Sequence, residues 1–180
     1  MLADWQIRDR IGTGSLEIHP FDPERVQPAS VDLLLDQYVR TLTPWGGFID
    51  VADVEEGHTT LSEIEEAGWL LQPGEFLLGS TVERVSLPDD LAARVEGKSS
   101  LGRLGLTVHV TAGFIDPGFS GQITLEIANL SGTPIRLRRL MPIAQLCLVP
   151  MSAAPVRPYG RAGNHYQGQY GPTESRYELR

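Results

Sequence analysis

Residues 97–129 read GKSSLGRLGLTVHVTAGFIDPGFSGQITLEIAN, and this stretch decides the fold. Two runs rich in β-branched residues, LTVHVTA and QITLEIAN, stand on either side of the turn sequence Asp116-Pro117-Gly118. Short runs of this kind, separated by Pro and Gly, are typical of strands joined by turns. The stretch therefore predicts β-strands linked by a turn.

The same pattern continues in both directions along the chain. Further β-rich runs stand between Pro and Gly signals: FLLGSTVERVSL (76–87), RVEGKSS (94–100), IRLRRL (135–140) and AQLCLVP (144–150). No long helical pattern alternates with them, which argues against a Rossmann or P-loop architecture. We therefore expect a mainly β protein, built as a sandwich, barrel or jelly roll.

The N-terminal residues 4–14, DWQIRDRIGTG, have the apolar spacing of a short helix. Asp4 is its predicted N-cap, and Gly12 or Gly14 its predicted end. The following residues carry weaker signals, which predict a loop at 21–28, a strand at 30–42, and an acidic loop with a short helical piece at 53–68.

The composition limits the classes of function. A chain of 180 residues is long enough for one domain with a buried core. Its formal net charge of −8 argues against general nucleic-acid binding, although a few converging cations can still hold a small polyanion. No apolar run approaches the ~18–20 residues of a membrane span, and the N-terminus is too polar for a signal peptide. Because Cys147 is also the single cysteine, we expect a cytoplasmic protein that binds neither nucleic acid nor membrane.

The glycine-punctuated turn at residues 97–103 supplies groups that hold phosphates. Lys98 and Arg103 are cations, and Ser99 and Ser100 add hydroxyls beside the N–H groups of the turn. The turn is not a P-loop, because the upstream glycine of that motif is missing. From the residues alone, a phosphate site and a solvated turn with incidental cations are equally well supported.

Two acids lie close to this turn in the sequence. Period two along residues 122–129 separates an apolar face from a face that holds Gln122, Thr124 and Glu126. Glu126 therefore points to water or, if its face lines a pocket, is a partly desolvated carboxylate suited to moving protons. Asp116, in the sequence Asp-Pro-Gly, is interpreted as part of a plain turn.

The histidines and the cysteine do not form a metal-ligand pattern. One cysteine cannot supply the H-x-E and P-C-x-x-C ligands of the zinc-dependent nucleobase deaminases. His109, within TVHVT, is interpreted as a packing or solvent-facing residue rather than a catalytic one. The tail from residue 157 lacks apolar periodicity, so it is either disordered or ordered by a ligand.

Taken together, these segments resemble the dCTP deaminases, relatives of the trimeric dUTPases. The resemblance covers nearly the whole chain and rests on VQPASVD (26–32), PGEF (73–76), residues 97–129, AQLC (144–147) and YQGQYGP (166–172). It implies one domain over residues 1–180 with a distorted, jelly-roll-like β-barrel of the dUTPase type and few short helices. It also implies a homotrimer whose active sites lie at the subunit interfaces.

The resemblance implies hydrolytic deamination of dCTP at cytosine C4 without zinc or another protein-bound metal. Glu126 would be the general base and proton shuttle, and the Ser99 hydroxyl and the Ala112 backbone would orient the attacking water. Arg103 would stabilise the site. Magnesium would enter with the triphosphate, and dTTP is a candidate feedback inhibitor.

The resemblance also implies which residues hold the nucleotide. Asp116 would bind the deoxyribose, and the tail at residues 157–180 would order over the bound nucleotide. The implied nucleotide-binding residues are Lys98, Ser99, Ser100, Leu101, Gly102, Arg103, Asp116, Thr124, Leu125, Glu126, Gln145, Tyr159, His165 and Gln169.

Two forms of this family exist: one stops at dUTP, and the other also releases diphosphate and gives dUMP for thymidylate synthesis. Gly113 and Phe114 stand where deaminase-only members typically carry His-Arg, which favours the dUMP-forming kind. A small Gly113 would leave room for a second water near the phosphates. The alternatives are a deaminase that gives dUTP and a catalytically silent nucleotide-binding regulator.

Two positions depart from the family pattern. His165 stands where the family usually has Lys, and a neutral His would lose a phosphate contact. Residues 138–140, Arg-Arg-Leu, replace the usual Trp-Pro-Gly or Arg-Pro-Gly turn before Met141. Both changes predict a weaker hold on the triphosphate.

Overall fold

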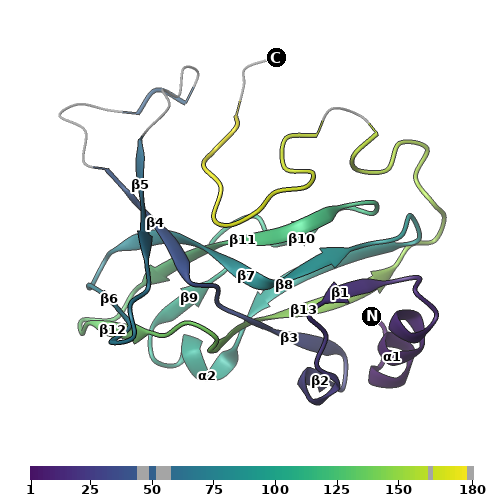
Figure 1. Ribbon diagram of the computed structural model, residues 1–180, viewed down its shortest axis with the longest axis horizontal. Coiled ribbons are helices and arrows are strands. Elements are labelled where there is room, and N and C mark those ends of the chain that lie inside the picture. The colour runs from purple at the N-terminus through teal and green to yellow at the C-terminus, as the bar shows by residue number, and fades with distance from the viewer. Residues whose placement is uncertain (44–48, 52–57, 162–163, 178–180) are drawn as a thin grey trace.

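The computed structural model describes residues 1–43, 49–51, 58–161 and 164–177. Strands predominate in the described chain, as expected (Figure 1). The elements are α1 (Asp4–Gly12), β1 (Glu17–His19), η1 (Pro23–Arg25), β2 (Val26–Gln27), β3 (Ser30–Leu34), β4 (Tyr38–Leu42), β5 (Thr59–Glu63), β6 (Trp69–Leu71), β7 (Phe76–Ser86), β8 (Leu91–Gly97), α2 (Ser99–Gly102), β9 (Leu106–Val108), β10 (Phe114–Ile115), β11 (Ser120–Asn129), β12 (Ile135–Leu137) and β13 (Pro142–Pro150).

Two main sheets enclose the core. One runs β5-β4-β7-β11-β9, with β1 paired to the end of β7, and the other runs β10-β8-β13-β3-β2. A third, small sheet pairs β12 with β6. Leu77 and Leu125 from the first sheet and Leu33 and Leu146 from the second are fully buried in one cluster. The two inner faces therefore bury their apolar side chains against each other, which supplies most of the hydrophobic stabilisation.

The predicted alternation along residues 122–129 is confirmed for most of β11. Leu125 and Ile127 are fully buried, whereas Thr124 and Glu126 are half-buried on the other face. Gln122 is the exception, because the pairing of β11 with β7 shifts between Gln122 and Thr124. Such an irregularity places two successive side chains inside, so Gln122 is buried although its phase predicted the outer face.

The N-terminal helix is confirmed, and its cap differs from the prediction. Asp4 is the first residue of α1, and Ala3 is the N-cap with extended backbone. The Gln6 side chain accepts the Ala3 N–H at 2.9 Å and so takes the capping role. Asp4 instead places a negative charge in the first turn, where the helix dipole favours it.

Three other segments differ from their local signals. The predicted strand at 30–42 is divided into β3 and β4 by Leu35 to Gln37, where the Asp36 N–H bonds to the Ser80 carbonyl at 2.8 Å. The predicted loop at 21–28 contains η1 and β2. In the acidic stretch, residues 53–57 lie outside the described residues, and residues 59–63 form strand β5 rather than a helical piece. Register pairing with β4, from Tyr38↔Glu63 to Leu42↔Thr59, overrides the weak helical signal.

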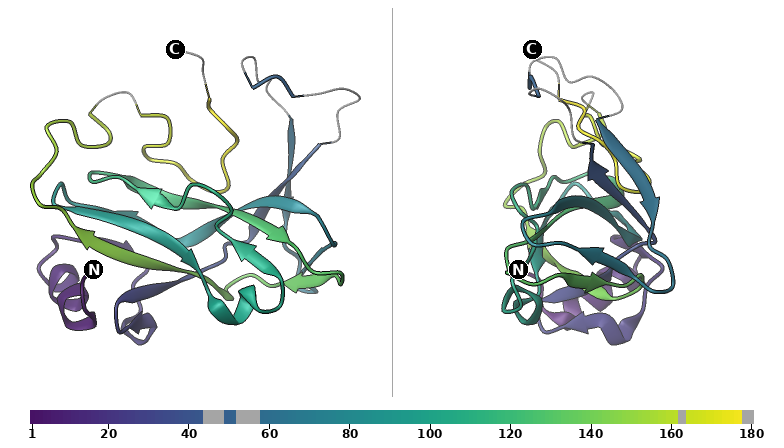
Figure 2. Two further views of the ribbon diagram at one scale, coloured as in Figure 1. Left: turned by 180° about the vertical axis from the view of Figure 1, so that it is seen from behind. Right: turned by 90° about the vertical axis from the view of Figure 1, so that its left-hand side faces the viewer.

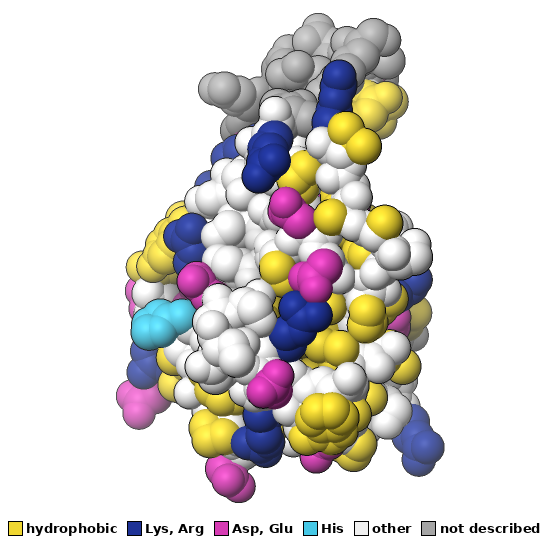
Figure 3. All heavy atoms as spheres, turned by 90° about the vertical axis from the view of Figure 1, so that its right-hand side faces the viewer, with side chains coloured by type: hydrophobic (Ala, Val, Ile, Leu, Met, Phe, Trp, Pro, Cys, Tyr) yellow, Lys and Arg dark blue, Asp and Glu magenta, His cyan; other side chains and the backbone are white. Residues whose placement is uncertain are grey.

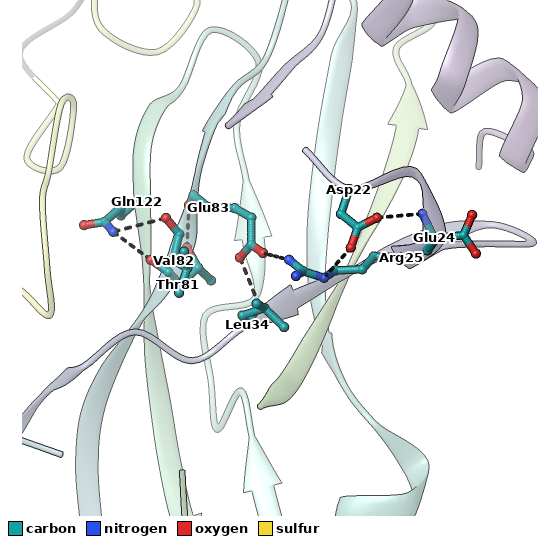
Figure 4. Close-up of polar contacts among 8 residues, drawn as sticks. All are labelled: Asp22, Glu24, Arg25, Leu34, Thr81, Val82, Glu83 and Gln122. Carbon is teal, nitrogen blue, oxygen red and sulfur yellow. Dashed lines mark hydrogen bonds and ion pairs between the residues drawn. The ribbon is translucent and has the colours of Figure 1, made fainter. Parts of the chain in front are cut away.

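A buried carboxylate joins the N-terminal segment to the sheets. The Glu83 side chain is 2% exposed, and its two oxygens accept from the Arg25 guanidinium at 3.0 Å and the Leu34 N–H at 2.9 Å (Figure 4). Burial raises the pKa of Glu83, and the Leu34 N–H and the Arg25 charge only partly offset this. This network links η1 to β7 and β3.

The chain after β13 crosses the molecule as an irregular tail. Figures 1 and 2 show the tail, green to yellow, lying over β10 and β11 beside the β4–β5 hairpin. The Gly168 N–H donates to the Ser120 carbonyl at 2.7 Å, and the Gln122 N–H donates to the Gln169 carbonyl at 3.1 Å. The tail therefore bonds to the part of β11 that β9 does not reach.

Candidate functional site

A cavity of about 560 Å³ lies between the six-stranded sheet and the tail. Its walls come from β7, β11, the β4–β5 hairpin, the segment between β9 and β11, and the tail. The lining includes an apolar set (Leu42, Phe76, Leu78, Val95, Phe114, Ile115, Phe119, Ile123) and a polar set (His58, Thr59, His109, Asp116, Thr124, Glu126, Tyr159, Tyr166, Gln169, Thr173, Glu174, Ser175). A mostly apolar hollow with convergent polar groups is the usual form of a small-molecule site.

Glu126 projects from β11 into this cavity, which settles the choice between pocket and open surface in favour of the pocket. Its side chain is 23% exposed. The Thr111 N–H donates to Oε2 at 2.8 Å, and the Thr111 hydroxyl lies 3.0 Å from Oε1 and 2.8 Å from Oε2. The carboxylate is therefore held in one orientation beside an apolar hollow, where proton transfer to a bound molecule is favoured.

His109 is the site residue that the sequence interpretation missed. Its side chain is 8% exposed, as expected of a packing residue, but Nδ1 lies 3.4 Å from Glu126 Oε2. The same nitrogen accepts the Glu126 N–H at 3.4 Å. Burial lowers the pKa of His109, and the Glu126 charge only partly offsets this. Pairing the two strand runs around the Asp-Pro-Gly turn would have revealed the contact, because β9 and β11 pair at Val108↔Ile127.

Seven of the predicted site residues line the cavity: Ala112, Phe114, Asp116, Thr124, Glu126, Tyr159 and Gln169. Asp116 also forms the predicted turn, since its carbonyl accepts the Phe119 N–H at 3.2 Å. The turn and binding interpretations of Asp116 are therefore compatible. Phe119 packs edge-on against Tyr159 with ring centroids 5.8 Å apart, which ties this turn to the tail.

The predicted phosphate turn lies elsewhere in the same chain. Lys98, Ser99, Ser100, Leu101, Gly102 and Arg103 surround α2 and are absent from the cavity lining. Figure 1 shows α2 at the opposite end of the molecule from the tail. Within one chain, the residues predicted to hold phosphates therefore lie away from Glu126, the predicted general base.

A polar cluster accompanies the phosphate turn. The Lys98 ammonium lies 2.6 Å from Asp32 Oδ1, and both side chains are largely buried. Gln145 pairs with Asp32 in the register of β13 and β3, and its Oε1 accepts from the Ser30 hydroxyl at 3.5 Å. Gln145, predicted to contact the base, therefore belongs to the Lys98 side of the molecule.

Three other predicted residues also lie outside the lining. The Leu125 side chain is fully buried in the core, so a ligand could contact Leu125 only through its backbone. His165 lies beside Tyr166, with ring centroids 6.1 Å apart. Gly113 has its carbonyl bonded to the Val95 N–H at 2.7 Å.

Gly113 has a steric role in the packing of the chain. A Cβ on Gly113 would lie 2.6 Å from the Val95 carbonyl oxygen, closer than real Cβ atoms come to such an atom. The missing side chain is therefore required by the close approach of β8. The predicted role of Gly113, to leave room for a second water near the phosphates, stays a prediction beside this packing requirement.

Among the described residues, no three His, Cys, Asp or Glu side chains gather into a group that could hold a metal ion. No helix in the described part of the chain is long and apolar enough to cross a membrane. On the face shown in Figure 3, acidic and basic side chains are interspersed with apolar ones.

The sequence profile of the dCTP deaminase-like family matches residues 1–151. This chain belongs to the dCTP deaminase-like family. A protein of Beutenbergia cavernae named "dCTP deaminase, dUMP-forming" is 50% identical over 184 residues, covering 100% of this chain and 96% of that protein. A protein of Rhodococcus opacus with the same name is 53% identical over 183 residues, covering 99% of this chain and 97% of that one. The predicted family is therefore confirmed.

Solved structures of this family and its relatives confirm the dUTPase-type β fold. A 2′-deoxycytidine 5′-triphosphate deaminase from Agrobacterium tumefaciens superposes with a TM-score of 0.67 at 25% identity, covering 87% of this chain. This chain spans 49%, about half, of that longer one. The dUTPase of Staphylococcus bacteriophage 80alpha superposes with a TM-score of 0.51 at 15% identity, covering 80% of this chain and 95% of that one. At that identity the likeness concerns the fold alone.

Proposed function

We propose that this chain is a hydrolase that converts dCTP and two water molecules to dUMP, ammonia and diphosphate. The observation that carries the proposal is the Glu126 carboxylate, held by Thr111 beside His109 in the wall of a largely apolar cavity. Membership of the dCTP deaminase-like family, with relatives about half identical that are named dUMP-forming, supports the substrate and the product.

In the proposed deamination, Glu126 takes a proton from water as the oxygen attacks C4 of cytosine. The carboxyl group then delivers that proton to the C4 amino group, which leaves as ammonia. The proton of the added hydroxyl moves to N3 as the carbonyl forms at C4. The Ser99 hydroxyl and the Ala112 backbone would orient the water, and Arg103 would stabilise the developing charge. Thr111 keeps the carboxylate aimed at the cavity throughout, because it bonds both oxygens.

We propose that the site is completed between subunits of a homotrimer. The cavity is lined by Glu126, the proposed general base, but not by the Lys98 to Arg103 turn of the same chain. A second copy could bring its own turn, including Ser99 and Arg103, to the cavity of the first. This arrangement would unite the cations with the acid, and the separation of the two groups within one chain supports it.

The nucleotide would then contact groups from both subunits. Asp116, Thr124, Tyr159 and Gln169 line the cavity and would bind sugar and base, with the tail at residues 157–180 ordered over the nucleotide. The phosphates would meet Lys98, Ser100, Leu101, Gly102 and His165, and the base would meet Leu125 and Gln145. Magnesium would arrive on the triphosphate, with phosphate oxygens and water as its main ligands.

One assay tests the proposed reaction. The purified protein is incubated with dCTP and magnesium, and ammonia, dUTP and dUMP are separated and measured over time. We expect ammonia and dUMP in equal amounts. Accumulation of dUTP without dUMP would overturn the diphosphatase half of the proposal and leave a deaminase. Binding of dCTP or dTTP without ammonia would identify a silent regulator, and inhibition of turnover by dTTP would identify the feedback inhibitor.

A further inference from the structure

The tail is anchored on β11 by a buried amide. Gln122 is 6% exposed, and its Oε1 accepts the Gly171 N–H at 2.6 Å. Its Nε2 donates to the Thr81 carbonyl at 2.8 Å and to Asp36 Oδ2 at 3.1 Å, and Figure 4 shows the amide against β7. A buried amide bonded at both ends is costly to disturb, so Gln122 fixes where the tail passes Gly171.

On both sides of Gly171, the tail forms one wall of the cavity. Gln169, Thr173, Glu174 and Ser175 all line it. The Gln169 amide is bonded within the protein, with Nε2 donating to the Gln122 carbonyl at 2.7 Å and Oε1 accepting from the Thr173 hydroxyl at 2.8 Å. The Thr173 N–H in turn donates to the Thr124 hydroxyl at 3.3 Å. These bonds join the tail to β11 and to itself.

Arg40 on β4 holds the far end of this wall. Its Nε donates to the Pro172 carbonyl at 2.7 Å, and its Nη1 donates to Glu174 Oε1 at 3.0 Å and to the Thr59 hydroxyl at 2.9 Å. The Thr59 hydroxyl also bonds to Glu174. Arg40 and Glu174 are each 25% exposed, so this ion pair is partly shielded from water. A shielded, multiply bonded Arg–carboxylate pair is stronger than a surface pair.

The pair also determines the charge of the cavity wall. Glu174 is a cavity-lining carboxylate, and a nucleotide triphosphate is a polyanion. An unpaired carboxylate in this wall would repel such a ligand, whereas the Arg40 guanidinium compensates its charge. Arg40 itself is absent from the lining, so it acts on the cavity through Glu174 and the tail.

We infer that Arg40 is a positioning residue for nucleotide binding: it holds the tail in place as the cavity wall and neutralises Glu174. This inference rests on the proposed function for its ligand. The described contacts of Arg40 are with the tail and Thr59 and not with Glu126, so the inference assigns Arg40 to the binding step.

The test compares Arg40→Met, Glu174→Gln and the double variant. Arg40→Met keeps the apolar stem and removes the cation, so KM for dCTP should rise about tenfold while kcat stays within about twofold. Glu174→Gln keeps the shape of the side chain and should change KM by less than about threefold. In the double variant, removal of the orphaned carboxylate should restore KM to within about threefold of the unmodified chain.

A second readout needs no substrate. Trypsin can cleave after Arg176, whose guanidinium bonds to the His165 carbonyl at 2.5 Å and lies over the Tyr166 ring while the tail is seated. Cleavage after Arg176, followed by mass spectrometry, should be several-fold faster in Arg40→Met. Arg136→Met is the matched control, because Arg136 is exposed on β12 and bonds to the Ala67 carbonyl away from the cavity. It should change neither readout.

Each outcome decides the inference. Unchanged KM and unchanged cleavage in Arg40→Met would overturn it, as would a fall in kcat with KM unaltered. A double variant as impaired as Arg40→Met would overturn the neutralising role of Arg40. If the unmodified chain gave no product from dCTP, the proposed function would fail, and the trypsin readout would still decide whether Arg40 holds the tail.

Discussion

Glu126 and His109 show how two residues 17 positions apart in sequence make one chemical unit. The Glu126 N–H and carboxylate both contact His109 Nδ1, and burial lowers the pKa of the imidazole. A neutral imidazole accepts the backbone N–H, whereas a protonated one could not. The pair therefore combines a fixed carboxylate with an uncharged neighbour, which leaves the carboxylate free to exchange a proton with a ligand.

Replacing Glu126 tests the assignment of the base. Glu126→Gln keeps the shape of the side chain and removes its ability to accept a proton, so ammonia release should fall by about 10³-fold or more. Binding of dCTP, followed by calorimetry, should change little, since only proton transfer is lost. Glu17→Gln, on the exposed face of β1, is the control and should retain full activity. Near-normal turnover in Glu126→Gln would assign the base elsewhere.

His109→Leu tests the supporting role of the imidazole. Leucine fills a similar buried volume, but it leaves the Glu126 N–H without its acceptor, so the backbone that carries the carboxylate is less constrained. We expect kcat to fall about tenfold while KM stays within about twofold. Steady-state kinetics on dCTP measure both constants. If the fall in kcat of His109→Leu were accompanied by a marked fall in its melting temperature, His109 would instead be a purely structural residue.

At the scale of elements, the turn between β12 and β13 carries backbone strain. Leu140 has φ 64°, and within the described chain it is the one non-glycine residue with positive φ. An L-residue in this region is disfavoured by about 1–2 kcal/mol because its Cβ approaches the carbonyl.

Leu140→Gly should therefore stabilise the protein. The side chain is 60% exposed, so little burial is lost, and relief of strain should exceed the added chain entropy by about 0.5–1 kcal/mol. Leu130→Gly is the matched control: Leu130 is 74% exposed without positive φ, and glycine there should destabilise by about 0.5–1 kcal/mol. Thermal unfolding at equal protein concentration measures both changes. A lower midpoint for Leu140→Gly would contradict the strain argument.

At the scale of the whole molecule, the Glu83 network couples the packing of the two sheets to pH. The folded-state pKa of Glu83 is raised, so the folded chain binds its proton more tightly than the unfolded chain does. Its contribution to stability is fully present below the ordinary pKa of a glutamate, near 4.5, and is lost as pH rises through the folded pKa. Above that pH, the buried negative charge depends on Arg25 and the Leu34 N–H.

Glu83→Gln should remove this pH dependence. The amide carries no charge to desolvate, so its melting temperature relative to the unmodified chain should rise as pH increases from about 4.5 to 8. Glu24→Gln, exposed on η1, is the control and should follow the unmodified chain. Melting curves at several pH values and one protein concentration decide this, because oligomer dissociation makes the midpoint concentration-dependent. A constant difference across the range would contradict the prediction.

Local patterns in the chain were enough to predict the β class, the short N-terminal helix and the apolar face of β11. These features depend on neighbours within a few positions, where periodicity and turn chemistry act directly. The partners of each strand depend instead on contacts between distant parts of the chain. Pairing of β9 with β11 brought His109 to Glu126, and the register shift in β11 turned Gln122 inward to anchor the tail. Gly113 likewise must lack a side chain because β8 approaches it closely, and no local sequence pattern predicts that approach.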